Sequence, residues 1–215
     1  MRKIFFVLFT VQVLFLVGCS ALQTDKEKIY TFLEDVVALE EDFALQQKPL
    51  AELEKKENDV YTSILQEPSS NTEEIVKLSE EGIAIVEQIE DVVTIEKDSL
   101  EKSEEKFEDI DKLINSVDDA NVKEILEQMK ETMANRYKQY RELNGEYSNL
   151  LGLEKELYEL FQDPNLSLDT LEQKLTNINN TYDAVDDLNS KFNELTRQYN
   201  EQKLNLYNEL NIELK

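Results

Sequence analysis

The sequence predicts an all-α fold: an elongated, antiparallel, up-and-down bundle of about four long helices with coiled-coil-like packing. With 4 Gly and 3 Pro in 215 residues, the chain has few of the residues that tight turns need. No alternating strand pattern or Gly-rich hairpin is visible. Apolar residues instead recur every three or four positions in long stretches separated by short polar loops. The alternative is a three-helix bundle with one broken or splayed segment.

The N-terminus has the pattern of a bacterial lipoprotein signal peptide. A positively charged start, residues 1–3, precedes an apolar run of about 14 residues, which is too short to span a bilayer as a mature helix. The following Leu-Val-Gly-Cys at 16–19 resembles a lipobox, and Cys19 is the only Cys in the chain. The resemblance implies cleavage before Cys19 and a lipid anchor on its sulfur. The alternative is an ordinary secretory signal followed by an accidental cysteine.

We therefore divide the chain into a signal peptide (1–18), a lipidated Cys with a short tether (19–23) and a single helical bundle domain (24–215). Thr24 and Glu27 match a capping box, so the first helix is expected to start at Asp25 and to run to about residue 65. Pro49 lies inside it and predicts a kink near Gln46. The alternative is two shorter helices joined at 46–48.

The second helix is expected after a loop at 67–72 and should run to about Val117. Either Ser70 or Asn71 could cap it, because each has a Glu three residues later. The middle of this helix interrupts its apolar seam with three polar residues. They are Glu96, Ser99 and Ser103. This stretch should therefore be the most loosely packed or most exposed part of the bundle.

The third helix follows a tight turn at 115–121 and has the clearest apolar periodicity, with spacings of four and three. Gly145 and Gly152 interrupt it at a cost of about 1 kcal/mol each relative to Ala. The last loop spans 162–167, and Ser167 is the expected cap of a final helix that runs to the end of the chain.

Composition excludes several classes of function. Without Arg2 and Lys3, which lie in the signal peptide, 21 basic residues oppose 47 acidic ones, a net charge of −26. A body this acidic would repel phosphate backbones, so nucleic acid is not an expected partner. The chain has no His, so it lacks the commonest general base and metal ligand, and one Cys can form neither an internal disulfide nor a Cys-rich zinc site. We expect no cofactor and no enzymatic activity.

Acidic and aromatic clusters give weaker signals. Asp183, Asp186 and Asp187 place carboxylates on one helical face, which could hold a cation or could be a solvated surface. Tyr residues gather in the last two helices and could line a groove for a glycan or peptide, or could fill core positions with their hydroxyls reaching water. They are Tyr137, Tyr140, Tyr147, Tyr158, Tyr182, Tyr199 and Tyr207. Arg136 and Asn189 also fall on apolar seams, where polar residues more often fix helix register than bind a ligand.

Three segments near the N-terminus resemble the YkyA family of cell-wall-binding lipoproteins of Gram-positive bacteria. The segments are Lys-Ile-Tyr-Thr-Phe-Leu-Glu at 28–34, Asp42-Phe43 with Gln-Gln-Lys-Pro-Leu at 46–50, and Glu-Leu-Glu-Lys-Lys-Glu at 52–57. The resemblance implies an all-helical fold and a place at the cell wall. It supplies no catalytic residue. The charge conflicts with one wall component, because anionic teichoic acids would repel this chain unless divalent cations bridge them.

We therefore expect a lipid-anchored, non-enzymatic protein on the outer face of the cytoplasmic membrane, facing the cell wall. Its partner would be a cell-wall polymer or an envelope protein. The alternative is a helical adaptor or chaperone for exported proteins without direct wall contact, and a wall hydrolase is a third possibility. Partner contact is expected at the end of the bundle far from the membrane, or else its loops are only connectors. The residues expected there are Tyr61, Pro68, Asn71, Tyr158, Phe161, Pro164 and Asn165.

Overall fold

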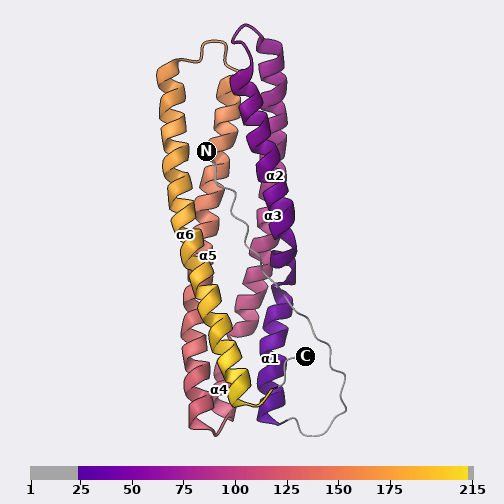
Figure 1. The fold of residues 1–215 in the computed structure, drawn as a ribbon, viewed down its shortest axis with the longest axis vertical. Helices are drawn as coiled ribbons and strands as arrows, with labels where there is room; N and C mark the ends of the chain where they lie inside the picture. The colour runs from indigo at the N-terminus through magenta and orange to yellow at the C-terminus, as the bar shows by residue number, and fades with distance from the viewer. Residues whose placement is uncertain (1–23, 213–215) are drawn as a thin grey trace.

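The computed structural model describes residues 24–212. The predicted signal peptide, Cys19 and the tether lie outside the described residues. Six helices follow in order, and the described part of the chain contains no strand. They are α1 (Asp25–Leu39), α2 (Glu41–Gln66), α3 (Thr72–Phe107), α4 (Ile110–Ser116), α5 (Ala120–Phe161) and α6 (Leu168–Glu209). Because α1 continues into α2 and α3 into α4, the chain forms four long arms (Figure 1), which confirms the predicted up-and-down bundle.

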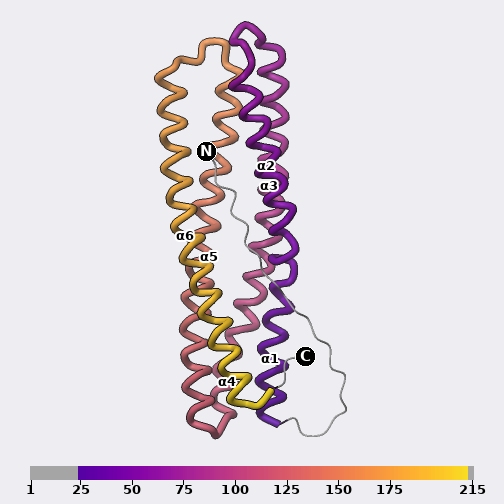
Figure 2. Tube along the Cα trace, viewed as in Figure 1, coloured from indigo at the N-terminus to yellow at the C-terminus, as the bar shows by residue number. Residues whose placement is uncertain are grey.

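The four arms form two pairs. α2 packs along α3, α5 packs along α6, and the contact of α3 with α5 joins the pairs, whereas α2 and α6 hardly touch. The start of α1, the end of α6 and the α4–α5 turn lie at one end of the bundle, and the α2–α3 and α5–α6 loops lie at the other (Figure 2). The aromatic rings of Tyr30 and Tyr207 meet at the first end, with centroids 5.6 Å apart. We call these ends proximal and distal.

The hydrophobic core is continuous at the proximal end and divided at the distal end. Twenty buried residues from all four arms, from Ile29 to Tyr207, form one proximal cluster. Distally, one cluster joins α2, α3 and α5, and a separate smaller one joins α5 and α6. Partly buried Tyr61, Tyr147 and Phe161 border both distal clusters. The distal half of α6 is therefore held mainly by α5.

The first arm consists of two shorter helices, as one alternative predicted, but they join at Glu40 and not at 46–48. The hydroxyl of Ser99 accepts a hydrogen bond from the Phe43 N–H (3.1 Å) and donates one to the Leu39 carbonyl (2.7 Å). It thus replaces the direct backbone bond between these two residues, and such an insertion separates one helix from the next. Pro49 lies within α2, which continues through it.

The polar seam of α3 is buried, so the middle of this helix is not the most exposed part of the bundle, which was one of the two predicted alternatives. Glu96, Ser99 and Ser103 are 6%, 1% and 0% exposed. Each has a partner: the Gln47 amide donates to Glu96 (2.7 Å), Ser99 bonds the α1–α2 junction, and Ser103 donates to Glu40 (2.8 Å). Ser99 and Ser103 face the polar groups of the break in the first arm, and Glu96 faces Gln47 farther along α2.

Apart from the break at Glu40 and a second break at 108–109, where the helix predicted to run to Val117 divides into α3 and α4, helix ends follow the sequence with two exceptions. Thr24 forms the predicted capping box, and Ser167 accepts from the Thr170 N–H (3.1 Å) as predicted. Asn71 stands at the start of α3, but its amide donates to Glu67 instead of capping the helix. α6 ends at Glu209 and not at the end of the chain. Asn211 has a left-handed φ of 50° and the Ile212 N–H returns to the Tyr207 carbonyl, the arrangement that closes a helix C-terminus.

Candidate functional site

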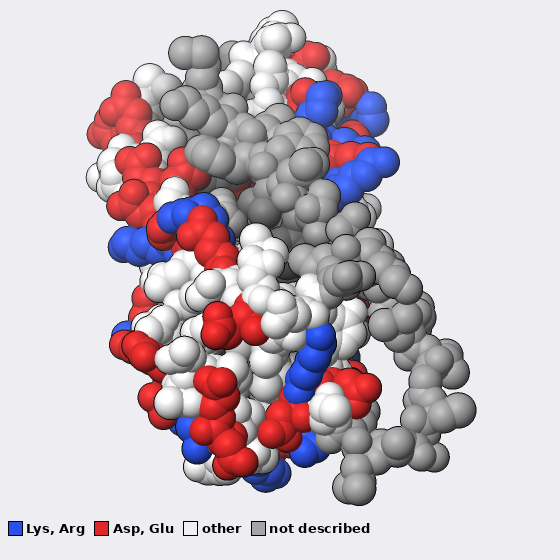
Figure 3. Space-filling view, turned by 60° about the horizontal axis from the view of Figure 1, so that its bottom comes forward, with Lys and Arg blue, Asp and Glu red and all other residues white. Residues whose placement is uncertain are grey.

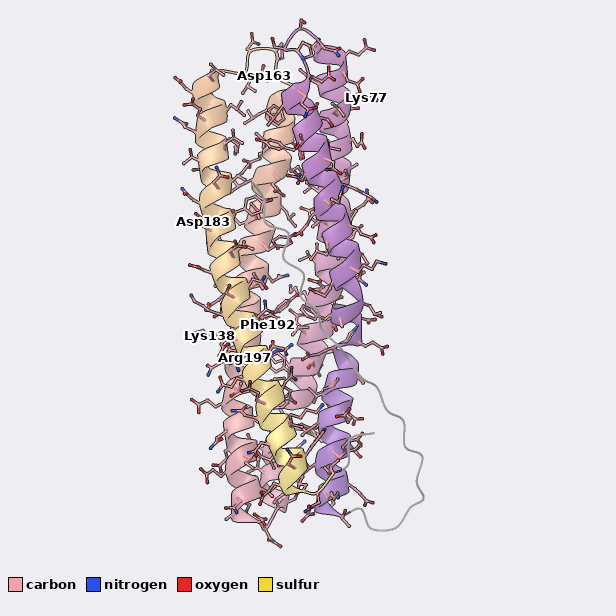
Figure 4. The ribbon with its side chains drawn as sticks, viewed as in Figure 1. Lys77, Lys138, Asp163, Asp183, Phe192 and Arg197 are labelled. Atoms are coloured by element: carbon pink, nitrogen blue, oxygen red, sulfur yellow. The ribbon has the colours of Figure 1, made fainter. Side chains whose placement is uncertain are left out.

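A groove lies between α2 and α6, where the two helices hardly touch, and encloses a cavity of about 570 Å³. α2 and α6 form its walls, and α3 and α5 form its floor. Phe192, labelled on α6 in Figure 4, lies in its lining with Phe43 opposite on α2. The groove is therefore a feature of the side of the bundle and not of its ends.

The sequence explains why this groove stays open. Each wall helix carries a second stripe at helical spacing, next to its apolar seam, made mostly of polar residues. On α2 the stripe is Gln47, Ala51, Glu54 and Asn58, and on α6 it is Asn179, Asp183, Asp186, Asn189 and Asn193. Two polar stripes gain little by burying each other, so the helices separate there. These facing stripes were the signal in the sequence that could have located the groove.

The groove carries charge of one sign. Its lining includes the carboxylates of Glu54, Glu96, Asp183 and Asp186 and contains no Lys or Arg. Burial, and then the neighbouring charge of Glu54, raises the pKa of Glu96 to about 8. A carboxyl group that holds its proton at neutral pH is a sign of a negative and poorly hydrated surrounding.

Tyrosines form much of the floor. The Tyr147 hydroxyl donates to Glu54 across the groove (2.6 Å). The Tyr140 ring packs between Phe43 and Phe192, with centroid distances of 5.8 and 5.5 Å. Its hydroxyl is buried and has no hydrogen-bond partner among residues 24–212, with the Asn144 side chain nearby but outside hydrogen-bonding geometry. The floor thus offers one free polar atom inside an aromatic cluster.

An ion pair closes the proximal side of the groove. Arg136, 1% exposed, donates two hydrogen bonds of 2.7 Å to the Glu40 carboxylate and one of 2.8 Å to the Thr196 hydroxyl. Its guanidinium also lies 4.8 Å from the centre of the Phe192 ring. The predicted structural role for Arg136 fits this position, because the pair ties α5 to the α1–α2 junction and to α6. Asn189, by contrast, lines the groove.

The residues expected at the distal end do lie there, but not all are accessible. Pro68 and Asn71 are exposed on one distal loop, and Pro164 and Asn165 on the other. Half-buried Tyr61 and Phe161 lie between the loops and the core, with ring centroids 6.3 Å apart. Tyr158 is completely buried, and its hydroxyl donates to the Glu57 carboxylate (2.5 Å). It is a core residue.

The members of the predicted tyrosine and aspartate clusters also differ in burial and in position. Tyr137, Tyr140, Tyr158, Tyr199 and Tyr207 are buried, and Tyr147 and Tyr182 are half-buried in the groove. Neither Tyr140 nor Tyr199 brings its hydroxyl to water, contrary to the expectation for core positions. Asp183 and Asp186 line the groove, and no group of three metal-ligating side chains is found between residues 24 and 212.

The exposed surface shows no continuous basic patch on the face that is visible in Figure 3. Acidic side chains of the described residues are spread over it, with basic ones among them. None of the described helices is long and apolar enough to cross a membrane.

Comparisons with known proteins agree with this architecture. The family model YkyA, described as "Putative cell-wall binding lipoprotein", matches residues 24–209. Uncharacterized lipoprotein YkyA of Bacillus subtilis (strain 168) is 31% identical over 199 residues, which cover 93% of this chain and 89% of that protein. A 1.6 Å crystal structure of a conserved protein of unknown function from Staphylococcus aureus superposes with a TM-score of 0.65 at 18% identity, covering 89% of this chain and 97% of that one. That similarity concerns the fold alone.

Proposed function

This chain belongs to the YkyA family of lipoproteins, and from that premise we propose that it is a non-enzymatic, membrane-anchored protein that binds a cell-wall polymer in the groove between α2 and α6. Residues 1–18 are removed in this proposal, and lipid on Cys19 holds the protein to the outer face of the cytoplasmic membrane. The remaining tether, residues 20–23, reaches at most about 14 Å. The proximal end of the bundle then stays close to the membrane.

One observation carries the choice of site: the groove is a lined cavity with aromatic, amide and carboxylate groups facing inward. Tyr offers a flat apolar face and a polar tip, which suit saccharide and peptide ligands alike. α6 alone is about 60 Å long, so an upright bundle presents its flank to the polymer layers outside the membrane. A net charge of −26 favours neutral or cationic parts of the wall over anionic ones.

Anchoring and wall binding can be tested separately. Cys19→Ala should release the protein into the medium or leave an unprocessed precursor in the cell. Purified protein that starts at residue 20 should sediment with isolated sacculi, whether or not teichoic acids have been removed. Unchanged membrane fractionation of Cys19→Ala would refute the anchor, and failure to sediment with either preparation would refute wall binding.

The distal end supports a second candidate function, an adaptor for exported proteins. Leu65 and Leu168, which flank the two distal loops, are 56% and 76% exposed. Exposed apolar side chains beside Pro68 and Pro164 are a surface on which another protein could dock. Crosslinking in intact cells tests this candidate. Charge-neutral substitutions at Pro68, Asn71, Pro164 and Asn165 should abolish the crosslink to a protein partner if the adaptor function is correct.

A further inference from the structure

The charge of the groove restricts its ligands. Four carboxyl groups line it, of which Glu96 holds its proton at neutral pH, and the lining contains no Lys or Arg. Arg136 lies one helical turn before Tyr140 on α5, and its guanidinium is held by the Glu40 carboxylate and the Thr196 hydroxyl. The Arg136–Glu40 pair is neutral as a unit, so it does not offset the charge of the acids in the groove. A cleft with charge of one sign and low-dielectric walls concentrates ions of the opposite sign.

The Tyr140 hydroxyl supplies an acceptor inside this field. It is buried without a hydrogen-bond partner, which costs free energy that a ligand donor can recover. Glu96 lies close enough for its charge to raise the pKa of Tyr140, after the larger effect of burial. A cation that enters between these groups would meet the Tyr140 hydroxyl oxygen and the carboxyl group of Glu96 together. It would also lower the cost of ionising Glu96.

The remaining lining suits an aliphatic chain that carries this cation. Leu50, Val93, Leu143 and Val185 provide apolar contact, and Phe43 and Phe192 add ring surfaces. Aromatic faces attract cations within about 6 Å of the ring centre. A bare metal ion fits less well, because residues 24–212 contain no group of three metal-ligating side chains.

We propose that the groove between α2 and α6 binds a protonated primary amine at the end of an aliphatic chain, presented by a cell-wall polymer. The ammonium group has three N–H donors, which the Tyr140 hydroxyl, the groove carboxylates and the amide oxygens of Asn144 and Asn189 can accept. The amine site follows from the groove itself. Only the identification of its carrier as a wall polymer rests on the proposed function.

The test compares two probes that differ in one charge. N-acetyl-lysine amide carries a single ammonium group, and the same compound acetylated on its side-chain nitrogen carries none. Titration of ¹⁵N-labelled protein by NMR should show saturable shifts at Asn144, Tyr147 and Asn189 with the first probe only. Equal binding of both probes, or of neither, would overturn the proposal.

Matched variants place the binding in the groove. The triple variant Glu54→Gln, Asp183→Asn, Asp186→Asn removes three groove charges while preserving shape, and we expect it to weaken binding of the amine at least tenfold. The control Glu90→Gln, Asp91→Asn, Asp98→Asn removes three exposed charges from α3 and should leave binding within twofold. Tyr140→Phe removes only the free hydroxyl, so its fold should be intact, and it should weaken binding several-fold. Equal effects of the two triple variants would contradict the assignment.

A second arm tests the carrier. Sacculi whose amines have been acetylated with acetic anhydride should lose most binding relative to untreated sacculi. If acetylated sacculi bind equally well, the wall ligand is not an amine and this inference is wrong, although wall binding itself stands. If the lysine probe binds but no sacculi do, the amine site stands and the proposed wall function is wrong.

Discussion

The buried pair of Arg136 and Glu40 shows how far a single residue can be interpreted from sequence. The position of Arg136 on an apolar seam correctly predicted a structural role. Its partner could not be predicted, because Glu40 resembles the exposed acids Glu41 and Asp42 that follow it, until the break in the first arm turns it inward. Ninety-six positions separate the two residues, and only the assembled bundle brings them together.

Removing one member of this pair should be far more damaging than removing an exposed one. Glu40→Gln leaves the Arg136 charge buried without its counter-ion, which costs about 3–5 kcal/mol. Glu104→Gln is the matched control, because Glu104 pairs with Arg141 at the surface (2.6 Å) and exposed pairs contribute at most about 1 kcal/mol. Urea unfolding measures both changes. Similar losses from the two variants would show that the buried pair has no special role.

Glu96 should make the stability depend on pH. Its pKa is raised from 4.5 to about 8, chiefly by burial, so the folded state binds this proton more tightly than the unfolded state does. The free energy of unfolding should therefore fall as pH rises from about 4.5 to about 8, by at most about 1.4 kcal/mol per pH unit, and level off above. The comparison is with Glu96→Gln, which keeps the amide contact of Gln47 but cannot ionise.

The difference in stability between the wild type and Glu96→Gln isolates this group from all others that titrate. The two proteins should be about equally stable below pH 4.5, and the variant should be the more stable above pH 8. The exposed Glu90→Gln should show no such divergence. A constant difference across the whole range would contradict the account of Glu96.

Among the elements, those bounded by strong local signals were predictable. Capping residues and polar loops placed the starts of α1 and α6 correctly and both ends of α5 nearly so. The break at Glu40 was not predictable, because its cause is the hydroxyl of Ser99, which lies on a different helix. Pro49 gave a stronger local signal at the wrong place. Local chemistry predicts where a helix can end, and tertiary contact decides which of these points is used.

Ser99→Ala tests the origin of this break. Without the hydroxyl, the Phe43 N–H and the Leu39 carbonyl lose their partners in the core, at a cost of about 1–3 kcal/mol. Ser79→Ala is the control, since Ser79 is equally buried on α3 but bonds only its own helix, through the Ile75 carbonyl. Amide exchange at Phe43 should accelerate only in Ser99→Ala. If the break at Glu40 persists in Ser99→Ala without loss of stability, the hydroxyl is not what separates the two helices.

The glycines of the helices should respond in opposite directions. A Cβ on Gly82 would lie 2.4 Å from the Tyr158 ring, whose hydroxyl is held by Glu57, so Gly82→Ala should destabilise the protein by about 1–3 kcal/mol. A Cβ on Gly145 or Gly152 would meet nothing within 4 Å, so Ala at either position should stabilise α5 by up to about 1 kcal/mol. Thermal unfolding of the three variants checks both signs. Stabilisation by Gly82→Ala would show that α3 and α5 can separate locally without cost.

At the scale of the whole molecule, the topology was predictable and the groove between α2 and α6 was not. Four stretches of similar length with short joints lead to an up-and-down bundle, which places both chain ends together and the distal loops opposite. The apolar residues show which helices pack together, but they do not show how closely α2 and α6, which share no apolar seam, approach each other. That spacing is set by the polar stripes of α2 and α6, whose individual residues look like ordinary surface.

The central claim, that the wall ligand binds in the groove, is tested most directly by closing the groove. Ala51 lines it from α2, so Ala51→Trp should fill it without removing a polar contact, whereas Ala134→Trp adds the same side chain at an exposed position of α5. In co-sedimentation with sacculi, Ala51→Trp should reduce binding at least tenfold. Ala134→Trp and the combined loop variant at Pro68, Asn71, Pro164 and Asn165 should bind as the wild type does. Full binding by Ala51→Trp together with loss of binding by the loop variant would contradict the account and place the site at the distal end.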